Sequence, residues 1–203
     1  MAFILINPVT LNMYNKHELK TFLKENDFEQ VFCSKDWISV VKTKYKNAIK
    51  SNSHAIVADM RCPAAVSFSK EKTSCKNLVF PQIEPILIHC AREISDTYAQ
   101  NGSVVITTPC HQLADYGNSL NLKNTRFVSW NNFAKKYKCP LKKVHLEESP
   151  IPPGFFSDVE KNVLSVTGKD LIQEAFESGN YKSARLVEML FCSGGCNNGD
   201  GVL

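Results

Sequence analysis

Short apolar runs alternate with amphipathic stretches along this chain. The apolar runs are too short for helices and are typical of buried strands. Strands are predicted at 2–6, 28–32, 54–59, 103–107, 125–129, 163–166 and 185–190. In the intervening stretches apolar residues recur three and four positions apart, which predicts helices. These helices are expected from Asn15 onward, at 35–50, at 84–100, from Asn131 onward and at 169–178.

The alternation of strands and helices indicates an α/β fold with mainly parallel sheet. The stretch 147–154, EESPIPPG, can continue neither a strand nor a helix and is expected to be a linker or crossing loop. Parallel strands in an open sheet end at one edge, and ligands bind outside those ends. The residues that follow each strand are therefore the first candidates for a site.

Composition and charge exclude several classes of protein. Of the 203 residues, 43% are hydrophobic and 22% are charged, which is typical of a soluble globular domain. The net charge of +4 comes from scattered lysines and arginines and forms no basic stripe, so no nucleic-acid partner is expected. The chain has no apolar run of membrane-spanning length, and its start does not resemble a signal peptide. We therefore expect a cytoplasmic protein without a membrane partner.

Eight cysteines are an unusual number for such a chain. In a reducing compartment, several cysteines indicate metal ligation, redox chemistry or buried thiols more often than a disulfide framework. Cys62, Cys110 and Cys192 each follow a predicted strand, and Cys196 lies four residues after Cys192. Four thiolates that converge at one sheet edge would suit either a [4Fe-4S] cluster or a structural zinc ion.

The residues between Cys192 and Cys196 would allow the backbone to approach a bulky group such as a cluster. Gly194 and Gly195 lack a Cβ atom, so their backbone N–H groups can approach a cluster and adopt positive φ angles. The other cysteines have simpler interpretations. Cys90 lies inside a predicted helix and is expected to be a packed thiol, and Cys75 and Cys139 are expected to be incidental. Cys33 follows a strand and is one extra candidate.

Three motifs in order resemble the active-site domain of the iron-only ([FeFe]) hydrogenases and their hydrogenase-like relatives. The motifs here are Arg61-Cys62-Pro63, Pro109-Cys110-His111 and Cys192-Ser193-Gly194-Gly195-Cys196. The resemblance implies that Cys62, Cys110, Cys192 and Cys196 bind a [4Fe-4S] cluster between two small lobes of mainly parallel sheet flanked by helices. We expect one compact domain over 1–203, with lobe one at about 1–100, lobe two at about 101–190 and a C-terminal cysteine loop at 191–203.

The chain departs from the family where a diiron subsite would be held. Arg61 stands in place of the family's proton-relay cysteine, and Leu113 stands in place of a lysine that hydrogen-bonds a cyanide ligand. An unpaired cyanide in a buried pocket would cost about 1–3 kcal/mol per lost partner. No residue is therefore assigned a catalytic role, and a diiron subsite is not expected. Arg61 is expected to place a fixed positive charge beside the cluster and to raise its potential.

Three hypotheses follow from these residues. The preferred one is an iron–sulfur protein that transfers electrons or senses redox state without hydrogen turnover. If the protein is an enzyme, it would be an iron–sulfur oxidoreductase of hydrogenase type, such as a minimal hydrogenase or hydrogen sensor with a diiron subsite bridged by Cys196. The third is a structural domain that binds zinc or no metal. A redox partner protein is compatible with the lysine-rich stretch 135–143, whereas the oligomeric state is not set by the sequence.

Overall fold

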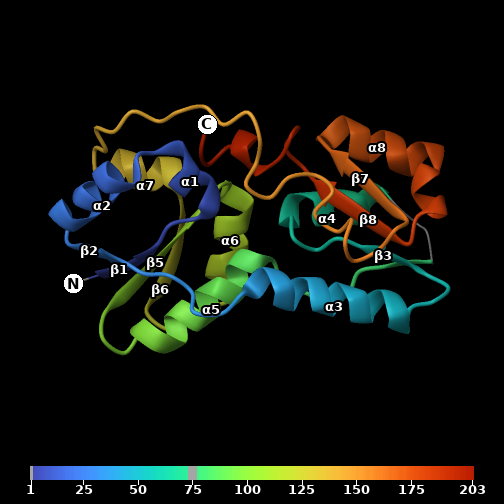
Figure 1. The fold of residues 1–203 in the computed structure, drawn as a ribbon, viewed down its shortest axis with the longest axis horizontal. Coiled ribbons are helices and arrows are strands. Elements are labelled where there is room, and N and C mark those ends of the chain that lie inside the picture. The colour runs from blue at the N-terminus through green and yellow to red at the C-terminus, as the bar shows by residue number, and fades with distance from the viewer. Residues whose placement is uncertain (1, 73–76) are drawn as a thin grey trace. The chain divides into compact units, whose positions relative to one another are not determined.

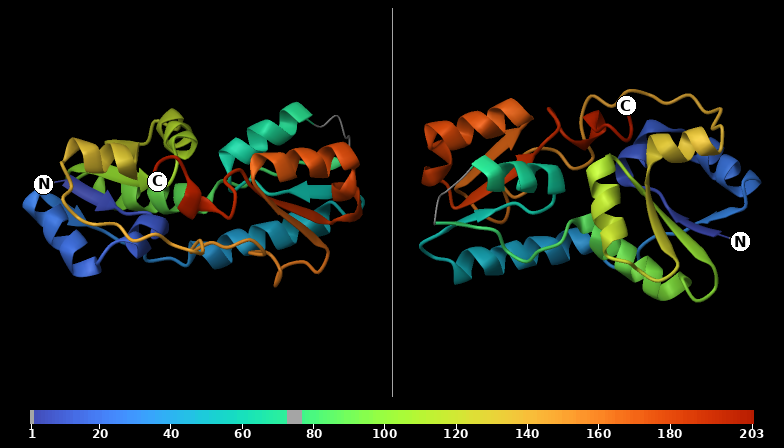
Figure 2. Two further views of the ribbon diagram at one scale, coloured as in Figure 1. Left: turned by 90° about the horizontal axis from the view of Figure 1, so that it is seen from above. Right: turned by 180° about the vertical axis from the view of Figure 1, so that it is seen from behind.

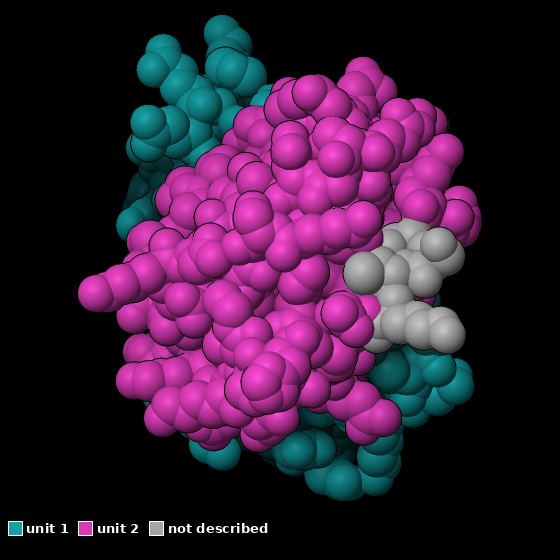
Figure 3. All heavy atoms as spheres, turned by 90° about the vertical axis from the view of Figure 1, so that its right-hand side faces the viewer, with its two compact units in different colours: residues 1–35, 87–150, 196–203 teal, residues 36–86, 151–195 magenta. Residues whose placement is uncertain are grey.

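The computed structural model describes residues 2–72 and 77–203, and these residues form two compact units (Figure 3). Unit 1 combines the chain up to Lys35 with Leu87–Pro150 and Cys196–Leu203, and unit 2 combines Asp36–Ile86 with Ile151–Gly195. Each unit contains one four-stranded parallel sheet, which confirms the predicted α/β class. The units interleave along the chain, so they differ from the expected division at about residue 100. The reason is that the strands of each sheet come from separate chain segments.

The unit 1 sheet has the strand order β2-β1-β5-β6, with every neighbouring pair parallel (Figure 1). Its strands are β1 (Ala2–Leu5), β2 (Phe28–Gln30), β5 (Ser103–Thr108) and β6 (Thr125–Ser129). Its helices are α1 (Pro8–Met13), α2 (Lys16–Glu25), α5 (Ile86–Tyr98, of which Ile86 falls in unit 2), α6 (His111–Ser119), α7 (Trp130–Lys136) and the 3-10 turn η2 (Cys196–Asn198).

Both faces of this sheet are covered, which explains its continuously apolar strands. Side chains alternate between the faces along a strand. Phe3 and Leu5 therefore pack into one core with residues of α5 and α6, whereas Ile4 packs into a second core with residues of α1, α2 and α7. Figure 2 shows these helices on both sides of the strands.

The unit 2 sheet has the strand order β4-β3-β8-β7 and is also parallel throughout. Its strands are β3 (Ile56–Ala58), β4 (Leu78–Val79), β7 (Val163–Thr167) and β8 (Leu186–Leu190). Its helices are α3 (Trp37–Ser51), α4 (Pro63–Lys72), α8 (Lys169–Ser178) and the 3-10 turn η1 (Asn180–Ser183). Residues of α4 and α8 build the core on one face, and α3 with Phe156 builds the core on the other.

Most predicted elements are confirmed, but three short helices were missed. Helix α1 begins directly after β1, because Asn7 caps it and Pro8 occupies its first turn. Helices α4 and α6 follow Cys62 and Cys110, and small residues such as Ala65 and Ala114 form part of their buried faces. The face of α4 carries a weak apolar periodicity, which is why the sequence pattern did not reveal this helix.

Asn7 joins the carboxyl ends of β1 and β5 and is almost fully buried. Its backbone N–H donates to Thr107 Oγ1 at 2.9 Å, and its Nδ2 donates to the same oxygen at 3.2 Å. The Asn7 side-chain oxygen accepts from the backbone N–H of Thr10 at 3.0 Å and so caps α1. This one side chain therefore connects two neighbouring strand ends to the helix that follows.

We predict that Asn7→Ala destabilises the protein more than Asn15→Ala, although both residues cap a helix. Asn15 is exposed and caps only α2, so its loss is expected to cost about 1 kcal/mol. Asn7→Ala also leaves buried partners unpaired, which adds about 1–3 kcal/mol. Urea unfolding of the two variants measures the difference, and equal midpoints would contradict this role of Asn7.

Candidate functional site

The candidate cysteines follow strand ends, as predicted, and are divided between the units. Cys62 lies after β3 and Cys192 lies after β8, both in unit 2. Cys110 follows β5 in unit 1, and Cys196 begins the last segment of that same unit. Neither unit, over the residues that the structure describes, by itself gathers three or more His, Cys, Asp or Glu side chains into a possible metal site. Each unit thus supplies two of the four predicted ligands.

In unit 2 the two cysteines lie at the ends of neighbouring strands. Strands β3 and β8 are paired, and the Cys62 sulfur accepts a hydrogen bond from the backbone N–H of Phe191, the residue before Cys192. The backbone N–H groups of Ala64 and Ala65, in the first turn of α4, also point at this sulfur. Burial raises the pKa of the Cys62 thiol, while these three N–H groups act to lower it. Burial is the larger effect, so the pKa of Cys62 lies above the usual thiol value and the unliganded side chain favours its protonated form.

The loop after Cys192 is held against the end of β7. The backbone N–H of Gly194 donates to Thr167 Oγ1 at 3.2 Å, and the N–H of Gly195 donates to the carbonyl of Cys192 at 3.2 Å. Gly194 and Gly195 have φ angles of 74° and 120°, a region that favours glycine. The conformation predicted for this pair is confirmed, and it folds the loop tightly around Cys192.

In unit 1 the tail that contains Cys196 is bound to the residues around Cys110. The backbone N–H of Gly201 donates to the carbonyl of Pro109 at 3.1 Å, and the N–H of His111 donates to Asp200 Oδ1 at 3.0 Å. A Cβ atom on Gly201 would lie 2.9 Å from the Cys110 nitrogen. Only a residue without a side chain allows this close approach of the tail to Cys110.

Arg61, directly before Cys62, lies in a buried ionic network that the sequence analysis did not anticipate. Its guanidinium donates to Asp59 Oδ2 at 2.8 Å and to Glu188 Oε1 at 2.7 Å. Tyr45 donates to Asp59 at 3.2 Å, and the Tyr45 oxygen accepts from the N–H of Met60 at 2.6 Å. The two carboxylates offset the arginine charge, which corrects the expectation of an uncompensated positive charge beside the cysteine.

The same network anchors the segment after the predicted linker. Glu188 accepts the backbone N–H groups of Gly154 and Phe155 at 2.9 and 3.1 Å. The guanidinium of Arg61 lies 4.1 and 4.4 Å from the ring centres of Phe155 and Phe156, within the range of cation–π attraction. A sequence signal for this network existed, because Glu188 interrupts an otherwise apolar strand. A carboxylate buried there requires a charged partner.

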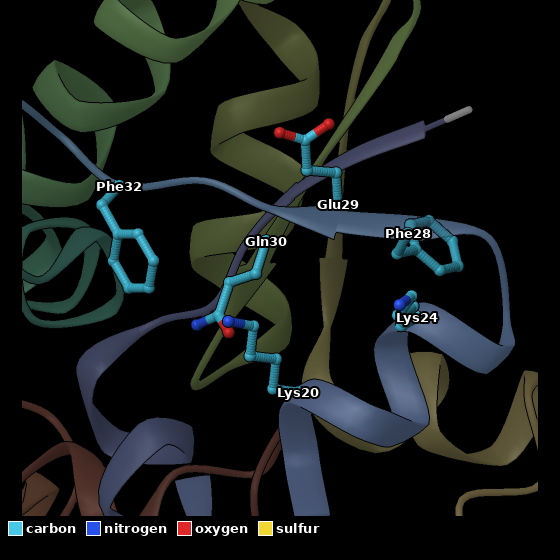
Figure 4. Close-up of a pocket in the computed structure, with 6 residues that line it drawn as sticks. All are labelled: Lys20, Lys24, Phe28, Glu29, Gln30 and Phe32. Carbon is cyan, nitrogen blue, oxygen red and sulfur yellow. The ribbon is translucent and has the colours of Figure 1, made fainter. Parts of the chain in front are cut away.

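Leu113 is buried in the core of unit 1 between α6 and the sheet. It therefore fills apolar space at the position where the resemblance would place a lysine. No residue of the predicted site lines the groove of about 430 Å³ beside β2 in unit 1, whose lining includes Lys20, Lys24 and Phe32 (Figure 4). Cys75 lies outside the described residues.

Comparisons with known proteins support the fold but not an assignment by sequence. No family model matches the chain, and no curated protein matches it. Solved structures of the [FeFe]-hydrogenase HydA1 from Chlamydomonas reinhardtii are similar in fold: one variant has a TM-score of 0.58, and an apo form of another variant has 0.57. Each is 11% identical to this chain, and each alignment covers 98% of this chain and 79% of the hydrogenase. The protein therefore has a hydrogenase-like fold.

No helix in the described part of the chain has the length and apolar character needed to cross a bilayer.

We predict that Arg61→Leu lowers the free energy of unfolding by about 3–5 kcal/mol, because it leaves Asp59 and Glu188 buried without their cation. The pair between Lys42 and Asp158, 2.7 Å long and with side chains 24% and 63% exposed, is the control. Lys42→Met should cost at most about 1 kcal/mol. The measurement is urea unfolding of metal-free protein, and a similar cost for both variants would disprove the role of the network.

We also predict that Gly201→Ala destabilises unit 1 by about 1–3 kcal/mol, because the new methyl group would overlap the backbone of Cys110. Leu203→Ala is the control in the same tail, since Leu203 is 58% exposed. Fluorescence of Trp130, which lies in the core of unit 1, reports the unfolding. A Gly201→Ala variant as stable as Leu203→Ala would show that the tail does not require this contact.

Proposed function

We propose that this protein is a cytoplasmic iron–sulfur protein in which Cys62, Cys110, Cys192 and Cys196 together hold one [4Fe-4S] cluster. The main support is the placement of the ligands at the carboxyl ends of parallel strands. In unit 2 the N–H of Phe191, next to Cys192, donates to the Cys62 sulfur, and in unit 1 the tail that follows Cys196 donates from Gly201 to the carbonyl of Pro109, next to Cys110. Ligands bind at such strand ends in open α/β sheets. The similarity in fold to [FeFe]-hydrogenases over 98% of the chain adds independent support.

The donor set fits an iron–sulfur cluster. All four candidates are cysteines, and each is partly rather than fully buried. Iron in such clusters is held by cysteine thiolates, and hydrogen bonds to sulfur raise the reduction potential. Cys62 already receives three backbone N–H groups, whereas the N–H groups of Gly194 and Gly195 donate to Thr167 and to the Cys192 carbonyl and hold the loop around Cys192. When bound, the cluster would supply one-electron redox chemistry.

The residues around the cysteines favour electron transfer or redox sensing over hydrogen turnover. Arg61 is held by two carboxylates and keeps its proton, because Asp59 and Glu188 raise the pKa of its guanidinium. It therefore cannot relay protons, and Leu113 offers no donor to a diiron ligand. We infer that hydrogen turnover is absent. A redox partner with an acidic surface would suit the exposed Lys135 and Lys136 of α7.

We predict that anaerobic reconstitution of the full chain with ferrous iron and sulfide gives a brown protein with about four irons per chain. Serine substitution of Cys62, Cys110, Cys192 or Cys196 should each lower the bound iron by more than half. Cys139→Ser is the control, because Cys139 is a partly buried thiol of unit 1 that packs against the same core as Cys196 but is not one of the four proposed ligands. Iron and acid-labile sulfide assays with a paramagnetic-resonance spectrum provide the measurement.

Two outcomes would overturn this proposal. A colourless protein that takes up one zinc ion per chain would favour a structural domain, since closed four-thiolate zinc sites are structural. Retention of the iron in the Cys62→Ser and Cys110→Ser variants would show that the cluster is held elsewhere. Hydrogen evolution after loading with a synthetic diiron cofactor would contradict only the inference about hydrogen turnover.

A further inference from the structure

Two cysteines of unit 1 that are outside the proposed cluster site lie in contact with each other. Cys33 follows β2, and Cys90 lies on α5, which packs against one face of the sheet. Their thiols are joined by a side-chain hydrogen bond, and both side chains pack against the same apolar core. Cys90 was expected to be a packed thiol; the structure packs it against this core, and it also places Cys33 beside it.

A second contact runs beside the first and holds the same two segments together. Glu93 lies three residues after Cys90, so both side chains project from the same side of α5. Its Oε1 accepts hydrogen bonds from the backbone N–H of Ser34 at 2.6 Å and from Ser34 Oγ at 2.7 Å. Residues 33 and 34 are thus joined to residues 90 and 93 at two successive positions. The contact between the thiols is therefore one of two neighbouring contacts that hold the segment after β2 against α5.

We propose that Cys33 and Cys90 form a reversible redox site, which closes to a disulfide by exchange with a small-molecule disulfide such as glutathione disulfide. The Cys33 thiolate attacks one sulfur of glutathione disulfide and releases one glutathione thiolate. The Cys90 thiol loses its proton and attacks the Cys33 sulfur of the mixed disulfide, which releases the second glutathione. Two protein thiols are oxidised to one disulfide, and one glutathione disulfide is reduced to two glutathione molecules.

The surroundings assign different roles to the two thiols. The hydrogen bond from Cys90 lowers the pKa of Cys33, although the carboxylate of Glu93 acts in the opposite direction. Cys90 retains its proton as the donor, and both this bond and burial raise the pKa of Cys90. Cys33 is therefore the attacking sulfur and Cys90 the resolving one. Both side chains are partly exposed, which gives a small disulfide access to the pair.

Disulfide formation requires the two sulfurs to reach an S–S bond of about 2.05 Å. The hydrogen bonds of Ser34 to Glu93 hold the two segments beside each other, so the bond would form between neighbouring side chains. Disulfides in a reducing compartment are usually transient and redox-sensing, which matches a pair that is accessible at the surface. The bond would tie the residues after β2 to α5 without involving any proposed cluster ligand.

Peptide mapping of the full chain after equilibration in glutathione redox buffers tests this proposal. Trypsin separates the two cysteines, because Cys33 lies in the peptide 25–35 and Cys90 in the peptide 77–92, each with no other cysteine. We expect these peptides to become linked as the buffer becomes oxidising, with loss of alkylation at both thiols, and to separate again after reduction. Cys139→Ser should leave the linkage unchanged.

Variants of the pair distinguish its two members. Cys90→Ser should abolish the linkage and leave a stable glutathione adduct on Cys33, whereas Cys33→Ser should leave Cys90 unmodified. Recovery of the peptides 25–35 and 77–92 unlinked from wild-type protein in oxidising buffer would overturn the proposal. Linkage of either peptide to a different cysteine would also overturn it. The mapping uses wild-type protein, so its result does not depend on the folding of any variant.

Discussion

The parallel arrangement of strands is the constraint on which the rest of the account depends. In each unit all strands point the same way, so loops that leave their carboxyl ends gather at one edge of the sheet. In unit 2 the carboxyl edge of the sheet carries Cys62 and Cys192, and in unit 1 the corresponding edge of the other sheet carries Cys110. Cys196 reaches the same edge of unit 1 through the tail that binds Pro109. The sheets thus bring Cys62 and Cys192 to neighbouring strand ends in unit 2, and in unit 1 they bring Cys110 to the tail that follows Cys196.

The fold class and the strand-end placement of the cysteines could be predicted because both depend on local patterns. Helix α8 was predicted with its observed limits, since a complete amphipathic face follows Gly168. The interleaved units could not be predicted, because the pairing of β3 with β8 joins segments more than a hundred residues apart. Contacts such as those of Arg61 with Glu188 depend on that pairing and were missed for the same reason.

The buried network changes the interpretation of the hydrogenase-like fold. Where the resemblance implies a proton-relay cysteine, the chain has an arginine whose charge is offset by two carboxylates and whose guanidinium packs on Phe155 and Phe156. This arrangement stabilises unit 2 and orders the loop at Gly154. The protein therefore has a hydrogenase-like fold, and the residues beside Cys62 form a buried ionic network.

The central claim is that cysteines from both units bind one cluster, and native-state alkylation of reconstituted protein tests it most directly. The reagent is iodoacetamide under anaerobic conditions, and peptide mass spectrometry reports each cysteine separately. The account predicts that Cys62, Cys110, Cys192 and Cys196 become protected together, in proportion to bound iron, while Cys139 stays reactive. Protection confined to the pair of one unit, at full iron content, would contradict it.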